Sequence, residues 1–160
     1  MRIELDSKVV ADEILALSAL HHMTSGGDKP LLTRDSLPAL RVMMRMVFAG
    51  VGVRLGSRIG RFETDESDTD PALPYDAASG VVMALTLNEG AVVPEGMPLM
   101  IKRQFEHLVA AGVMERIAAG SGDALWSRMR RECEEALTAL TEGARMASES
   151  VAPMRREAFG

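Results

Sequence analysis

The sequence contains a single cysteine and lacks an apolar stretch long enough to cross a membrane. Cys133 alone cannot form an intrachain disulfide, and its place in an apolar series at helical spacing predicts a packed helix residue and not a nucleophile. The longest apolar-rich segment, residues 42–53, is interrupted by Arg45. No charged segment leads into an apolar stretch at the N-terminus, so we expect neither a signal peptide nor a membrane span, and an intracellular site of synthesis.

Basic residues are also fewer than acidic residues. Lys and Arg number 18 against 23 Asp and Glu, which gives a net charge of −5 at pH 7. A general nucleic-acid binder needs a basic surface to neutralise phosphates, so this class of protein is not expected. The glycines between residues 50 and 60 do not fit a dinucleotide-binding fingerprint, because Leu55 takes the place of its third glycine and the run does not follow a strand.

No group of residues predicts a metal, cofactor or catalytic site. His21 and His22 are adjacent, so on a helix they point in different directions, and no cluster of further ligands accompanies them. His107 lies in a predicted helix without a nucleophile near it in the sequence. We therefore expect no catalytic, cofactor-binding or metal-binding residues, and an enzyme is the functional class with the least support.

Charge is distributed unevenly along the chain. Residues 34–61 contain six arginines against one acid, whereas residues 62–95 contain eight acids and no Lys or Arg. Two explanations remain open: solvated faces that neutralise each other within one subunit, or a protomer with a positive and a negative side, which suits head-to-tail contacts in a ring. The candidate interaction residues on these two blocks are Arg41, Arg45, Arg54, Arg58, Asp65, Glu66, Asp68 and Asp70.

The spacing of apolar residues predicts a mainly α protein: a bundle of about four helices with a β-hairpin or ribbon and extended termini. We expect a single helical domain over residues 1–147, with the β segment at about 59–88, and a C-terminal tail over 148–160. Residues 1–5 alternate and predict a short edge strand or arm. The expected helices run from Asp6 or Ser7 to about Leu20, from Ser36 through Leu55, from Pro98 through Ile117, and from about Asp123 to Met146.

Several details of these helices carry further expectations. Residues 21–30, with two glycines and a proline, predict a loop. Arginines spaced four apart predict a charged stripe on the second helix, opposite its apolar side. Gly52, Gly56 and Gly60 predict a close helix approach or a helix end. Phe105 and Trp126 are expected in the shared core of an antiparallel final helix pair.

The order of these elements resembles the small head-tail connector, or adaptor, subunits of tailed bacteriophages and prophages. The likeness rests on a second helix introduced by LLTRDSLPAL, a β segment VVMALTL, and the helix VPEGMPLMIKRQFEHLVAAGVMERI followed by ALWSRMRRECEEALTAL. It is a likeness of order and pattern over most of the chain, closest between about residues 80 and 140. Few aromatic residues and a longer acidic loop depart from the family pattern.

The resemblance implies a structural subunit of a homo-oligomeric ring, commonly of twelve copies, which is docked beneath a portal in the virion neck and joins it to tail or head-completion proteins. We expect the β segment and acidic loop to project from the helical body and contact neighbours, and no specific nucleic acid or membrane partner. The alternatives are another virion completion protein, or a small helical binding or regulatory module in the cytoplasm. Twelve methionines suit contacts that remodel on assembly.

Overall fold

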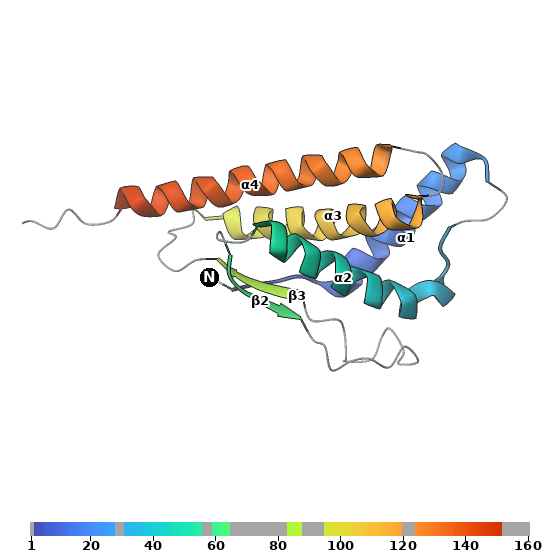
Figure 1. Ribbon diagram of the computed structural model, residues 1–160, viewed down its shortest axis with the longest axis horizontal. Helices are drawn as coiled ribbons and strands as arrows, with labels where there is room; N and C mark the ends of the chain where they lie inside the picture. The colour runs from blue at the N-terminus through green and yellow to red at the C-terminus, as the bar shows by residue number, and fades with distance from the viewer. Residues whose placement is uncertain are drawn as a thin grey trace, which may run out of the picture.

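The structure, a computed structural model, describes residues 2–27, 31–55, 59–64, 83–87, 95–119 and 124–151. The described chain is mainly α-helical, with four long helices, one 3-10 turn and a small antiparallel sheet, as the apolar spacing predicted (Figure 1). In chain order the elements are β1 (Arg2–Glu4), α1 (Ser7–Ser25), η1 (Arg34–Ser36), α2 (Leu37–Leu55), β2 (Ile59–Thr64), β3 (Met83–Leu87), α3 (Met97–Ile117) and α4 (Leu125–Val151).

Helix α3 is the centre of the bundle, because α1, α2 and α4 each pack against it (Figure 1). The segment from Leu108 to Met114 is apolar on all sides, and every one of its residues is buried. A helix with this composition is stable only when neighbours cover it all round. Helix α4 runs antiparallel to α3, and Phe105 and Trp126 are both in the core, which confirms the predicted final helix pair.

Helices α1 and α2 lie on opposite sides of α3. In Figure 1, α2 crosses in front of α3 and runs toward the left of the view, and α1 passes behind it and rises steeply toward the upper right. Each turns one apolar side toward the core, with Val10 and Ile14 of α1 and Leu40, Met44 and Val51 of α2 fully buried. The remaining sides of α1 and α2 therefore point away from each other.

The sheet has three strands, with β3 in the middle and β1 and β2 at its edges. Both pairings are antiparallel, and Ile3 and Phe62 are each aligned with Leu85 from either side. The strand at Ile59–Thr64 and the hairpin it forms were predicted, and the alternating N-terminal residues form the expected edge strand. A two-stranded hairpin is marginal in water, so the third strand and the helices above it complete the sheet.

One expectation about the β segment is wrong. Met83, Ala84 and Leu85 of β3 are fully buried, so the central strand is part of the core and does not project from the helical body. The physical reason is that β1 and β2 pair with the two edges of β3, and these flanking strands contact α3 and α2, respectively. The acidic segment between β2 and β3, residues 65–82, lies outside the described residues.

Helix α1 ends later than the sequence indicated. The side chain of Asp6 caps it by accepting hydrogen bonds from the backbone N–H groups of Lys8 and Val9, as expected. The helix continues through His21 and His22, which were assigned to a loop, and stops at Gly26, whose φ of 67° is the left-handed conformation of a helix end. Packing extends it: His21 is buried, with its ring 5.8 Å from that of Trp126.

Helix α4 is also longer than predicted. It continues to Val151, beyond the expected end at Met146 and through the first residues assigned to a tail. The predicted start of this helix at about Asp123, and the chain from residue 152 onward, lie outside the described residues. Helix α2, in contrast, begins directly after Ser36 with Pro38 in its first turn, as expected.

Candidate interaction surface

The most unusual surface of the protein is the outer side of α2. Among the α2 side chains that the structure describes, the exposed ones are Ala39, Val42, Met46, Ala49, Val53 and Arg54. The first five, which we call the α2 outer face, follow each other at intervals of three and four residues. This spacing forms one continuous stripe along a helix, and it is the spacing of the seam between two packed helices.

Helix α2 is therefore apolar on both sides. Val42 is 48%, Met46 56% and Val53 84% exposed, while the opposite side of the helix fills the core. The outer side of α4 has the usual composition of a solvated face, with Arg128, Arg131, Glu132 and Glu135 exposed. A soluble surface helix normally has one apolar stripe, so the second stripe on α2 has the composition of an interface.

The arginines predicted to stripe this side are placed differently. Arg41 is only 3% exposed and Arg45 is half-buried, so the expected charged stripe is wrong at both positions. The helical turn carries position 41 to the side of Leu40 and Met44, which faces the core. Arg54 is exposed as expected. Arg58 and the acids Asp65, Glu66, Asp68 and Asp70 lie outside the described residues.

Arg54 belongs to an ion-pair network that joins α2 to α4. Its Nη2 atom is 2.7 Å from Oε1 of Glu134, and Nη1 of Arg130 is 2.9 Å from the same oxygen. Arg130 also donates a hydrogen bond to Glu115 of α3. Burial opposes the charged form of Arg130, but its contacts with Glu115 and Glu134 outweigh this and raise the pKa of the guanidinium. Arg54 is thus neutralised at least in part within one subunit.

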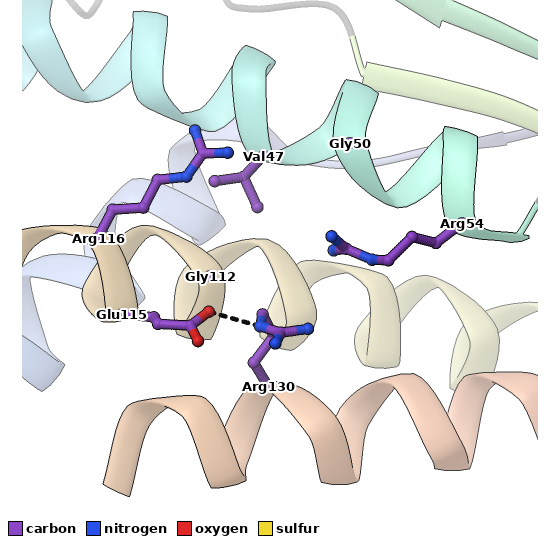
Figure 2. A pocket seen from close by; sticks show the side chains of 7 residues that line it. All are labelled: Val47, Gly50, Arg54, Gly112, Glu115, Arg116 and Arg130. Carbon is purple, nitrogen blue, oxygen red and sulfur yellow. Dashed lines mark hydrogen bonds and ion pairs between the residues drawn. The ribbon is translucent and has the colours of Figure 1, made fainter. Parts of the chain in front are cut away.

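A shallow cleft lies beside the α2 outer face, between α2, α3 and α4. Figure 2 shows side chains of Arg54, Arg116 and Arg130, one from each helix, around it, and it holds roughly 370 Å³ of empty space that is partly open to solvent. Arg116 is exposed and has no ion-pair partner among the described residues. The lining includes no cysteine, serine or histidine. The cleft can therefore accept an anionic group, but it offers no thiol, hydroxyl or imidazole group.

Cys133 and His107 are the other positions that were considered for chemistry, and both make contacts within the subunit. Cys133 is half-buried on α4, and burial together with the charges of Glu13, Glu132 and Glu134 raises the pKa of its thiol. The thiol is therefore protonated at neutral pH, which suits the predicted packing role. His107 contacts Glu13 of α1 on the surface. Within the described ranges, no three His, Cys, Asp or Glu residues are grouped to hold a metal ion, and no helix combines the length and apolarity needed to cross a bilayer.

The close helix approach among the glycines whose surroundings the structure describes is at Gly112. Of the glycines predicted for a close approach or a helix end, Gly56 lies outside the described residues, directly after the end of α2 at Leu55, and Gly60 lies in β2. A Cβ atom at Gly112 would be 2.6 Å from Cγ1 of Val47, so α2 packs directly on the α3 backbone there. The same addition at Gly50 of α2 meets nothing within 4 Å. The sequence alone does not identify Gly112 as a contact point, because the contact depends on which helix crosses it.

Replacing Gly112 with alanine is expected to lower the free energy of unfolding by up to about 2 kcal/mol. Alanine favours a helix by about 1 kcal/mol, but the overlap with Val47 costs about 1–3 kcal/mol. The Gly50→Ala variant, which gains the same propensity without a clash, should be equal to the parent or more stable. Urea unfolding followed by circular dichroism compares the three proteins, and equal effects of the two substitutions would contradict the close contact.

The comparisons with known proteins identify no relative. No family model matches the chain, and searches of curated proteins and of solved structures give no match.

Proposed function

We propose that the chain is a structural subunit that assembles with copies of itself through the α2 outer face. The sequence resemblance favours one particular assembly, which is the ring that joins portal to tail in the neck of a tailed phage. The single observation that carries the proposal is the second apolar stripe of α2, formed by Ala39, Val42, Met46, Ala49 and Val53. In this proposal the subunit has a structural role and no catalytic one.

The energetic argument is that apolar surface is costly to leave in water. Burial of apolar area contributes about 25 cal/mol per Å², so five exposed apolar side chains in one row stabilise a contact that covers them. Met46 at the middle of the row is flexible and adapts to the shape of its partner. The adjacent cleft, with Arg54 and Arg116, adds a place where an acidic group of the neighbour is attracted.

The proposal is tested by the mass of the protein in solution. Size-exclusion chromatography with light scattering is expected to give the parent a mass of several chains. The Met46→Glu variant, which places a charge in the middle of the stripe, should shift toward a monomer because burying an unpaired carboxylate is unfavourable. Met46 is 56% exposed, so its replacement should leave the fold and its circular dichroism spectrum unchanged.

The matched control is Ala139→Glu, which makes a similar change at an exposed position of α4. It should assemble like the parent. Closed rings of the parent in electron micrographs would support the neck assignment. A parent that is monomeric at every concentration would overturn assembly through this face, and a small helical binding module would then be the better description. An oligomer that Met46→Glu leaves intact would show that another surface makes the contact.

A further inference from the structure

A second apolar surface lies on the outer side of α1. The exposed residues in the second half of this helix include Ala16, Ala19, Leu20 and Met23, which we call the α1 outer face. Leu20 is 55% and Met23 80% exposed. The first half of the same side is polar, with Asp12 exposed one turn before Ala16. Like the α2 outer face, this row has an apolar composition although α1 already buries its other side in the core.

The two faces are on opposite sides of the molecule. Helices α1 and α2 pack against α3 from behind and from in front, and each turns its outer face away from α3 (Figure 1). Two different apolar surfaces that point in opposite directions allow one copy to bind the next in the same way, without closing after two copies. Such a heterologous contact repeats into a ring or a filament.

The spacing of exposed residues matches between the two faces. Counted from Asp12, the α1 row continues at 16, 19 and 23, with steps of four, three and four residues. Counted backward from Val53, the α2 row continues at 49, 46 and 42, with the same steps. Antiparallel packing places Met23 opposite Val42, Ala19 opposite Met46, and Ala16 opposite Ala49. The bulky Met46 then meets a small alanine, as interdigitated helices require.

Charge selects the antiparallel direction over the parallel one. In the antiparallel register, Asp12 of one copy lies opposite Val53 of the next, beside the exposed Arg54. In the parallel register, Asp12 lies opposite Val42, where the nearest arginines are the buried Arg41 and the half-buried Arg45. Antiparallel helices also bring opposite ends of their dipoles together. Complementary charges of this kind set orientation more than they add affinity.

We infer that the α2 outer face binds the α1 outer face of a second copy of this chain, with the two helices antiparallel. The inference rests on the proposed function and specifies its contact.

Cysteine pairs test the contact and its direction in the full chain. All variants start from Cys133→Ser, so that the native thiol does not react. A chain with Met23→Cys and Val42→Cys should form a ladder of disulfide-linked dimers, trimers and larger species under mild oxidation. The control has Met23→Cys and Val53→Cys, where the antiparallel register separates the two thiols by about 16 Å at 1.5 Å per residue, and it should remain largely unlinked.

Each outcome of the cross-linking experiment corresponds to a different contact between copies. A ladder from the control pair and not from the first pair would overturn the antiparallel direction. Dimers from Met46→Cys alone would show two α2 faces bound to each other, and would overturn the α1 partner. An assembled parent in which neither pair cross-links would overturn this contact while leaving the proposed function intact. A parent that stays monomeric and forms no ladder would overturn both.

Discussion

Replacing Trp126 with alanine is expected to lower the free energy of unfolding by about 3–5 kcal/mol, the usual range for removing a large buried aromatic side chain. Trp126 is 2% exposed, lies in the first turn of α4 and packs with its ring 5.8 Å from that of His21 near the end of α1. It joins two helices that both pack on α3. The loss of this side chain would leave a cavity where α1 and α4 meet.

The neighbouring residue supplies the control. Leu125 is 39% exposed, so Leu125→Ala should cost much less than Trp126→Ala. The indole nitrogen of Trp126 is buried with no hydrogen-bond acceptor among the described residues. Trp126→Phe removes that donor and keeps most of the packing, so a cost below about 1.5 kcal/mol is expected. Circular dichroism in a urea series measures the free energy of unfolding of all four proteins. Tryptophan fluorescence is not suited to this comparison, because Trp126 is the only tryptophan and two of the variants lack it. An unchanged midpoint for Trp126→Ala would contradict its place in the core.

The second large effect is expected at Glu106, a carboxylate that is 1% exposed in the middle of the bundle. Its Oε1 atom accepts a hydrogen bond of 3.0 Å from the backbone N–H of Asp6, and Oε2 accepts one of 2.8 Å from Arg103. Asp6 is the residue that caps α1, so Glu106 fastens the start of α1 to α3. Glu106→Ala removes both bonds and leaves a cavity, so a loss of about 2–4 kcal/mol is expected.

Two further variants separate the parts of this contact. Glu106→Gln keeps an oxygen for Asp6 but loses the charge beside Arg103, whose side chain is 52% exposed, so its cost should be well below that of Glu106→Ala. Lys102 is 3.8 Å from the same carboxylate, and Lys102→Ala should change stability by less than about 1 kcal/mol. If Glu106→Gln lowered the free energy of unfolding as much as Glu106→Ala, the charge of Glu106, and not its hydrogen bond to Asp6, would stabilise the contact between the start of α1 and α3.

The sequence alone determined the class of fold and most of its elements. The apolar period located α2 and α3 and the strand at Ile59–Thr64, because these patterns follow from local geometry: a helix repeats every 3.6 residues and a strand every two. It also placed Phe105 and Trp126 in a shared core. Helix ends were less predictable, since α1 continues through His21 and His22, and the contact of His21 with Trp126 joins residues far apart in the sequence.

The tertiary structure decided which side of each apolar helix is covered. The sequence predicted an apolar side of α2 opposite its arginines, but only the packing of α2 against α3 shows that Arg41 faces inward and that Val42 and Met46 face water. Likewise, Gly112 became a contact point because Val47 crosses it, and β3 became a buried central strand because residues 2–4 pair with it. The candidate interaction surface depends on such long-range contacts, which residue spacing along one helix cannot specify.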